Sequence, residues 1–403
     1  MKFNRLILWT IATILSVQPL KAEPASAVNQ IAKANNAFAI DLYKNLAKEP
    51  GNLVVSPFSV DTALTMAYAG ARGNTAKQMA AVLHFANGDT NVHARLSALL
   101  KDLRDTNTLG CQLDIANALW AEQRYPFLPS YLVFLHDQYD ASLNQFEPVV
   151  SDPAKKAALR KQINSWVESK THNKIKEIVP LSLPSDYTRL ILVNAIYFKG
   201  LWATPFHKKL TKDALFHVSA GESVSVPIMH AKAELKYGEN DDLRVLEMPY
   251  RSNRLSMVIL LPKKNDGLAD LEKTLTISGI EQLLQTGSLQ EVNVYLPKFK
   301  ATSRFDLKKP LEDLGIVDAF SGKADFSGIT DPSDLFIEAA LHKAYVAVDE
   351  EGTEATAATA VSFANSASVI FNADHPFLFL IRHNPTGAIL FLGRVANPLS
   401  NDQ

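Results

Sequence analysis

The sequence predicts an α+β fold, because helical and strand-like patterns fall into separate blocks and do not alternate along the chain. Apolar residues recur at helical spacing through much of the N-terminal part, whereas continuous or alternating apolar runs dominate after residue 190. The 403 residues are 47% hydrophobic and 21% charged, a composition that supports a large core and excludes a disordered chain. This length suits one large domain or two smaller ones.

The first 27 residues have the pattern of a secretory signal peptide. Two positive charges, Lys2 and Arg5, precede an apolar run over residues 6–17 that is too short to span a membrane. Small residues then allow cleavage at two positions, after Ala22 or after Ala27. We therefore expect residues 1–27 to be removed and the protein to be secreted or periplasmic, with no membrane anchor.

Charge and cysteine content exclude several partners and sites. The 41 basic and 42 acidic residues leave a net charge of −1, whereas nucleic acid or an anionic membrane would require a basic excess. The single cysteine, Cys111, excludes an internal disulfide and a zinc site with several thiolates. We expect no cofactor and no metal.

Four helices are expected in the N-terminal block. Ser56 is placed to cap the second of them, and Pro57 occupies its first position, where the missing N–H costs nothing. Pro50-Gly51 ends the first. The four expected ranges are 31–46, 57–71, 75–83 and 92–103.

Strands dominate the rest of the chain. Residues 113–121 alternate between apolar and polar, and residues 190–198 are nearly all apolar, as expected for a strand buried on both faces. Further strands are expected at 214–218, 224–229, 243–249, 255–261, 291–300, 377–382 and 388–395. Helices are expected at 154–169, 268–274 and 307–314.

An uncharged tract between Glu354 and Asp374 is compatible with two conformations. Its Ala, Ser and Thr content allows a flexible surface loop. Its alternation also fits a strand with one small or apolar face, formed by Thr353, Ala355, Ala357, Thr359 and Val361. Inside a sheet, ten or so backbone hydrogen bonds at roughly 0.5–1.5 kcal/mol each would contribute on the order of 10 kcal/mol, comparable with the stability of a whole domain.

This tract and the acidic turn before it resemble the proximal hinge of inhibitory serpins, over Glu350-Glu351-Gly352-Thr353-Glu354-Ala355-Thr356-Ala357-Ala358-Thr359-Ala360. The C-terminal signature of that family is matched by Phe371-Asn372-Ala373-Asp374-His375-Pro376-Phe377-Leu378-Phe379-Leu380-Ile381. Further blocks match in the same order at 52–79, 117–120, 163–167, 192–202, 315–316 and 324–329. The chain is thus similar to serpins over residues 28–398.

The resemblance implies a single serpin domain over residues 28–403. It implies a large central, mostly antiparallel sheet, additional sheets, about nine helices and an exposed reactive-centre loop at about residues 350–372. It further implies a monomeric, irreversible suicide-substrate inhibitor of serine or cysteine proteases that is not itself an enzyme. The protease would cut the loop and form a covalent acyl-enzyme, and the cleaved loop would insert into the sheet as an extra strand.

The reactive bond is expected between Ser366 and Ala367 when positions are counted forward from Glu350. Counting back from Pro376 gives positions nearer to Phe363, so the alternates are Phe363, Ala364 and Asn365. The small residues suit elastase-like or subtilisin-like proteases, whereas Phe363 suits chymotrypsin-like or cathepsin-like ones.

Two supporting clusters follow from the resemblance. A polar cluster beneath the opening sheet, the shutter, is assigned to Ser56, Ser59, Asn194 and His342. The point where insertion begins, the breach, is assigned to Trp202, Lys298 and Glu350.

Two other functions remain as alternatives. One is a serpin fold that does not inhibit and instead binds a ligand or acts as a chaperone. Such members usually carry bulky or charged residues in the hinge, and the small or apolar set above contains none. The other is an enzyme such as a serine hydrolase, but the chain has no Gly-x-Ser-x-Gly elbow, no His-Glu-x-x-His motif and no phosphate-binding glycine loop.

Overall fold

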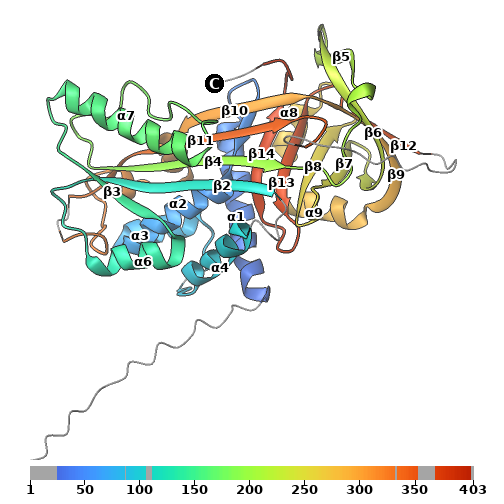
Figure 1. Cartoon of the computed structure of the whole chain (residues 1–403). Coiled ribbons are helices and arrows are strands. Elements are labelled where there is room, and N and C mark those ends of the chain that lie inside the picture. Colours follow the sequence, from blue (N-terminus) through green and yellow to red (C-terminus); the bar gives the residue numbers. More distant parts are fainter. Residues whose placement is uncertain (1–24, 87, 106–110, 332–333, 353–367, 401–403) are drawn as a thin grey trace, which may run out of the picture.

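The computed structural model describes residues 25–86, 88–105, 111–331, 334–352 and 368–400. Within these residues nine α-helices surround two β-sheets, which confirms the predicted α+β class and the expected number of helices (Figure 1). None of the described helices is long and apolar enough to cross a membrane.

The helices form where capping residues and apolar periodicity predict them. Ser56 Oγ accepts a hydrogen bond from the backbone N of Ser59 at 3.2 Å, so the predicted cap is present. Two helices that the sequence analysis did not predict, α6 and α9, also occur. The bounds are α1 (Ala25–Leu46), α2 (Pro57–Gly70), α3 (Gly73–Val82), α4 (Val92–Arg104), α6 (Pro129–Tyr139), α7 (Pro153–Lys170), α8 (Leu268–Thr274), α9 (Ile277–Thr286) and α10 (Lys308–Leu314).

The central sheet has five strands in the order β10-β11-β4-β2-β3. Its pairing is mixed: β10 with β11 and β2 with β4 are antiparallel, whereas β4 with β11 and β2 with β3 are parallel. The expected predominance of antiparallel pairs therefore does not extend to this sheet. The strands are β2 (Cys111–Glu122), β3 (Ser142–Phe146), β4 (Leu190–Gly200), β10 (Phe299–Asp306) and β11 (Ile337–Val348).

The second sheet has nine strands, and all its pairs are antiparallel except β9 with β12. The single strand predicted at 291–300 is wrong, because the chain leaves this sheet after Pro297 and enters the central sheet at Phe299. The strands are β1 (Leu53–Val55), β5 (Lys212–Ser219), β6 (Glu222–Glu239), β7 (Leu243–Pro249), β8 (Leu255–Pro262), β9 (Ser288–Pro297), β12 (Val369–Asn372), β13 (Phe377–His383) and β14 (Ile389–Val395).

The strand β4 lies at the centre of the molecule and is covered on both faces, as its continuous apolar sequence predicts. Ile191 and Val193 belong to a core layer shared with Ile163 of α7, whereas Leu192 and Ile196 belong to the main core beneath the sheet. Figure 1 shows α7 on one side of this sheet and α1 and α2 on the other.

Candidate functional site

The candidate site is built on the seam between β4 and β11. The two strands are parallel and in register, with Asn194 opposite His342 and Tyr197 opposite Tyr345. They therefore end side by side, at Gly200 and at Val348. A chain that turns back at this end runs antiparallel to both strands at once.

The chain does turn back at this end. Asp349 and Gly352 exchange two backbone hydrogen bonds, of 3.2 and 3.3 Å, which close a tight turn directly after β11. Gly352 also forms an antiparallel bridge with Leu201, the residue that follows β4. Gly352, the last residue of the turn, is thus paired with the residue that follows each strand, Leu201 after β4 and Asp349 after β11.

Only glycine fits at position 352. Its φ of +114° lies in the region that favours glycine, and an added Cβ would overlap the carbonyl oxygen of Gly200 and lie 2.7 Å from the Cα of Leu201. The glycine of the predicted hinge therefore has a specific geometric role, which is close approach to the end of β4.

Glu350 belongs to this turn, and its carboxylate is bound by two residues from other parts of the chain. It accepts hydrogen bonds from Lys298 Nζ at 2.8 Å and from Thr211 Oγ1 at 2.9 Å, and only 6% of the residue is exposed. Burial alone would raise the pKa of Glu350, but these bonds outweigh it and hold that pKa below its ordinary value. The pair with Lys298 that the resemblance assigned to the breach is thus formed, and its carboxylate is not a solvated surface charge.

Trp202, the third residue assigned to the breach, supports the turn from the other side. Its indole Nε1 donates to the carbonyl of Asp349 at 3.0 Å, and its backbone N donates to the carbonyl of Glu351 at 3.1 Å. The ring is 1% exposed and stacks on Tyr250, with centroids 4.6 Å apart. The ring therefore fixes the position at which the chain turns back.

The four residues assigned to the shutter form one buried hydrogen-bonded cluster. His342 bonds to Asn194 across the seam, and its Nε2 accepts from the backbone N of Ser56 at 3.1 Å. Asn194 in turn donates to the carbonyl of Ser59 at 2.9 Å, and Ser56 Oγ donates to the carbonyl of Leu390 at 2.6 Å. The cluster therefore connects β4, β11, the start of α2 and β14.

These bonds define the protonation state of His342. Because Nε2 accepts from a backbone N–H, Nδ1 carries the proton and donates it to Asn194 Oδ1. Burial lowers the pKa of His342 to about 3. The ring is therefore neutral at neutral pH and serves as a bridge across the seam.

Sequence reasoning missed two members of these clusters, Asn117 and Thr211. Asn117 lies on β2 directly opposite Asn194 and accepts a hydrogen bond from it. The available signal was that Asn117 lies in the block 117–120 that resembles the family. Thr211 lies outside the blocks that resemble the family, so the sequence carried no signal for its bond to Glu350.

The structure describes both ends of the predicted reactive loop. Glu350, Glu351 and Gly352 form the turn, and β12 follows Ser368, whose Oγ accepts from Asn293 Nδ2 at 2.6 Å. The other hinge residues lie outside the described residues: Thr353, Glu354, Ala355, Thr356, Ala357, Ala358, Thr359 and Ala360. So do the reactive-bond positions Phe363, Ala364, Asn365, Ser366 and Ala367. In the part of the chain that is described, no group of three or more side chains is arranged to hold a metal ion.

Comparison with known proteins gives consistent matches over nearly the whole chain. The model of a family described as "Serpin (serine protease inhibitor)" matches residues 33–398. A leukocyte elastase inhibitor of Sus scrofa is 42% identical over 390 residues, which cover 92% of this chain and 100% of the relative. Uncleaved ovalbumin superposes with a TM-score of 0.83 at 33% identity, covering 91% of this chain and all of that one. Human thyroxine-binding globulin superposes with a TM-score of 0.84 at 28% identity, covering 93% and 100%.

Proposed function

Because the chain belongs to the serpin family of serine protease inhibitors, we propose that it is an irreversible suicide-substrate inhibitor. The target protease cuts the reactive loop and forms an acyl-enzyme, and the cleaved loop then inserts between β4 and β11. The observation that carries this proposal is the position of Gly352, which is bridged to Leu201 and to Asp349. In the proposed mechanism, this bridge would be the first pair of the inserted strand.

The residue pairs that follow along the inserted strand require no change of register. Continued from the bridge to Leu201, an antiparallel strand brings Thr359 opposite Asn194. Continued from the bridge to Asp349, the same strand brings Thr359 opposite His342. Asn194 and His342 are already partners across the seam, so both extrapolations agree and Thr359 would arrive at the shutter.

The same register selects the face that each inserted side chain would occupy. Val346 and Ala344 of β11 belong to the main core, and the residues that would come opposite them are Ala355 and Ala357. Both methyl groups are small enough for a closely packed interior. The small or apolar set therefore meets the core, whereas Glu354 and the alternate residues face the other side.

Insertion exchanges one parallel ladder for two antiparallel ones. The net gain is about one ladder, and ten or so hydrogen bonds at about 1 kcal/mol each would give on the order of 10 kcal/mol. That is comparable with the stability of a typical domain. The intact form is thus proposed to be held kinetically, and cleavage releases the loop.

We propose Ser366–Ala367 as the reactive bond, with Phe363, Ala364 and Asn365 as alternates. The relative named as a leukocyte elastase inhibitor supports an elastase-like target, because elastases have a narrow pocket that accepts small residues. If Phe363 is the position cleaved, the proposed targets include cysteine proteases of the cathepsin type. The protein acts as a substrate that traps its enzyme and is not a catalyst.

The proposal includes the compartment and the assembly. Residues 1–27 serve as a signal peptide, cleaved after Ala22 or Ala27, and the mature monomer acts outside the cytoplasm. Mass spectrometry of the secreted protein tests both cleavage positions in one measurement.

The experiment that tests the function mixes the mature protein with an elastase, subtilisin, chymotrypsin and a cathepsin. An SDS-resistant band at the summed mass of protein and protease is expected for at least one of them. Mass spectrometry of the peptide released with the complex identifies the reactive bond. Cleavage of the loop with no covalent band would favour a ligand-binding or chaperone role; thyroxine-binding globulin has the same fold.

A further inference from the structure

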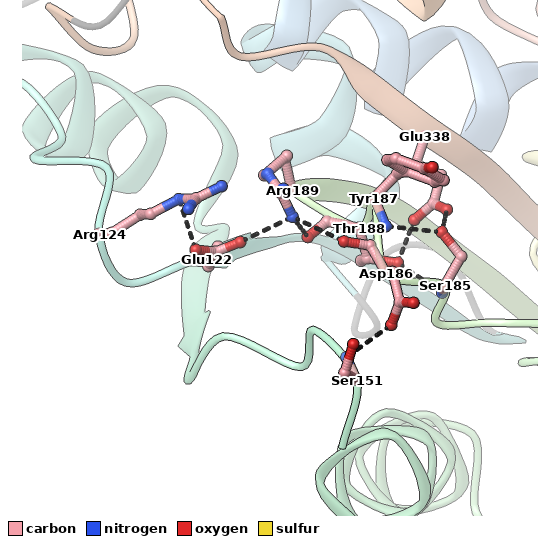
Figure 2. Close-up of polar contacts among 9 residues, drawn as sticks. All are labelled: Glu122, Arg124, Ser151, Ser185, Asp186, Tyr187, Thr188, Arg189 and Glu338. Atoms are coloured by element: carbon pink, nitrogen blue, oxygen red, sulfur yellow. Dashed lines mark hydrogen bonds and ion pairs between the residues drawn. The ribbon is translucent and has the colours of Figure 1, made fainter. Parts of the chain in front are cut away.

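We propose that Glu338 is a positioning residue that keeps the seam between β4 and β11 closed at the end opposite to Gly352. This inference rests on the proposed function, because it concerns the loop insertion described there. We use the name latch for Glu338 together with Ser185 and Thr188, the two hydroxyl residues to which it is bonded (Figure 2).

The contacts of the latch are complementary and specific. Ser185 Oγ donates to one carboxylate oxygen of Glu338, and Thr188 Oγ1 donates to the other. Each hydroxyl also accepts a backbone N–H, with Ser185 N 2.8 Å from Thr188 Oγ1 and Tyr187 N 3.0 Å from Ser185 Oγ. A hydroxyl oriented by an incoming N–H is free to donate its own proton, so the turn is organised to bind this carboxylate.

A β-bulge directs Glu338 toward these hydroxyls. Ile337 is paired with Leu190, and Ala339 is paired with Ile191, so Glu338 is an extra residue without a partner in the β4 register. A bulge changes the direction of the side chain that it contains. At this position it places a β11 carboxylate against the segment that leads into β4.

The other side-chain bonds that Figure 2 shows for this segment connect it to β2 and to the region that leads into α7. Arg189 Nη1 donates to Glu122 Oε2 on β2 at 3.1 Å, and the carboxylate of Glu122 is fully buried. Asp186 accepts from the backbone N of Ser151 at 2.7 Å and lies 2.6 Å from Lys156 Nζ on α7. If β11 separates from β4, these bonds remain intact, whereas the latch must break together with the backbone ladder and the His342–Asn194 bond.

Insertion of a strand breaks the latch for a geometric reason. An added strand moves its neighbours apart by about 4.8 Å, whereas a hydrogen bond fails beyond about 3.5 Å. In the register continued from Gly352, Phe363 would arrive opposite Leu190, at the level of the latch. The latch therefore exists in the intact form, is absent from the inserted form and opposes the final rungs of insertion.

The test compares intact and loop-cleaved protein for wild type, Glu338→Ala and Glu338→Gln. Glu338→Ala is expected to lower the melting temperature of the intact form by several degrees and to leave that of the cleaved form unchanged. The half-life of trapping activity on warming should shorten about tenfold, the factor that corresponds to 1.4 kcal/mol. Glu338→Gln keeps one acceptor oxygen and should fall between alanine and wild type.

Asp186→Ala is the matched control, because its partners stay on the same side of the seam and both forms should lose stability equally. Equal losses in the intact and cleaved forms of Glu338→Ala would show an ordinary structural role and overturn the latch, and so would no loss in either form. If cleavage does not stabilise the wild-type protein at all, both the proposed loop insertion and the proposed role of the latch are contradicted. If cleavage stabilises the wild-type protein and Glu338→Ala has the same melting temperature as wild type, only the latch proposal is contradicted and the proposed function stands.

Discussion

Asn194 and His342 lie opposite each other on two parallel strands and share a buried hydrogen bond across the seam between them. No helix or turn links these two residues locally, so the bond depends on β4 and β11 remaining paired. His342 is fully buried and Asn194 is 3% exposed, so water cannot replace the bond without opening the sheet. The pair is therefore a direct indicator of the closed state.

We predict that His342→Ala loosens the intact form. The substitution removes the acceptor of the Ser56 backbone N–H and the donor to Asn194, and each unsatisfied buried group costs about 1–3 kcal/mol. Urea unfolding should show a loss of this size, with faster loss of trapping activity on storage. His136, whose side chain is 80% exposed, provides the control, and His136→Ala should change stability by less than about 0.5 kcal/mol. Equal effects of the two substitutions would contradict the role of the shutter.

Gly352→Ala is predicted to convert the inhibitor toward a substrate. The added methyl group would overlap the Gly200 carbonyl and place alanine at a φ of +114°, so the chain could not lie between the strand ends. Insertion should slow relative to release of the cleaved loop, and the number of inhibitor molecules consumed per trapped protease should rise several-fold. Titration of a fixed amount of protease measures this ratio.

The matched control for that titration is Gly221→Ala. A Cβ at Gly221 meets no atom within 4 Å, and the residue has no positive φ. An unchanged ratio for Gly352→Ala would show that the turn need not be preserved for trapping.

The sequence was sufficient for features that depend on neighbouring residues. Ser56 and Pro57 begin α2 as their cap and first-turn preferences predict, and the apolar run from residue 190 forms the strand buried on both faces. Helix α6 was missed because Leu132 and Val133, 41% and 59% exposed, obscure the periodicity of its buried residues. The exposed apolar residues of α6 thus hid the helical pattern of its buried face.

Features that depend on distant parts of the chain were not predictable from the residues alone. Pro297 breaks the strand pattern beside Lys298, but no local pattern shows that the chain then joins the other sheet, and one strand was predicted where two occur. The latch joins Glu338 to residues 150 or more positions earlier in the chain, and it depends on a bulge that no local pattern reveals. The resemblance assigned residues to the breach and the shutter, but only the structure shows that Thr211 bonds to Glu350 and Asn117 to Asn194.

Thr353→Arg is predicted to abolish trapping and to leave cleavage intact. In the proposed register Thr353 comes opposite Val348, which belongs to the main core. A guanidinium group buried there without a partner would cost several kcal/mol. The protease should cut the variant at the same bond and then be released, with no SDS-resistant band. Thr356→Arg is the control, because Thr356 would come opposite Tyr345 on the other face, where the charge can reach solvent. Covalent complex from Thr353→Arg at the wild-type ratio would exclude this hinge register.

Asp61 is predicted to make the intact protein less stable as the pH rises. The residue is fully buried on α2, and burial raises the pKa of its carboxyl to about 7, although a hydrogen bond from Thr65 opposes the shift. The folded state therefore binds this proton more tightly than the unfolded state, whose carboxyl titrates near 4. The stability that Asp61 contributes is fully present below about pH 4 and is lost as the pH rises through about 7.

Asp61→Asn removes this dependence without changing the shape of the side chain. The variant and wild type should have similar free energies of unfolding near pH 4, and the variant should become more stable by up to about 4 kcal/mol at pH 8. Urea unfolding of both proteins between pH 4 and pH 8 measures the difference. Asp137, whose side chain is 62% exposed, serves as the control, and the comparison with Asp137→Asn shows whether the trend is specific to the buried carboxyl. A constant difference between Asp61→Asn and wild type across this range would mean that the carboxyl titrates alike in the folded and unfolded states, and burial on α2 would then not perturb it.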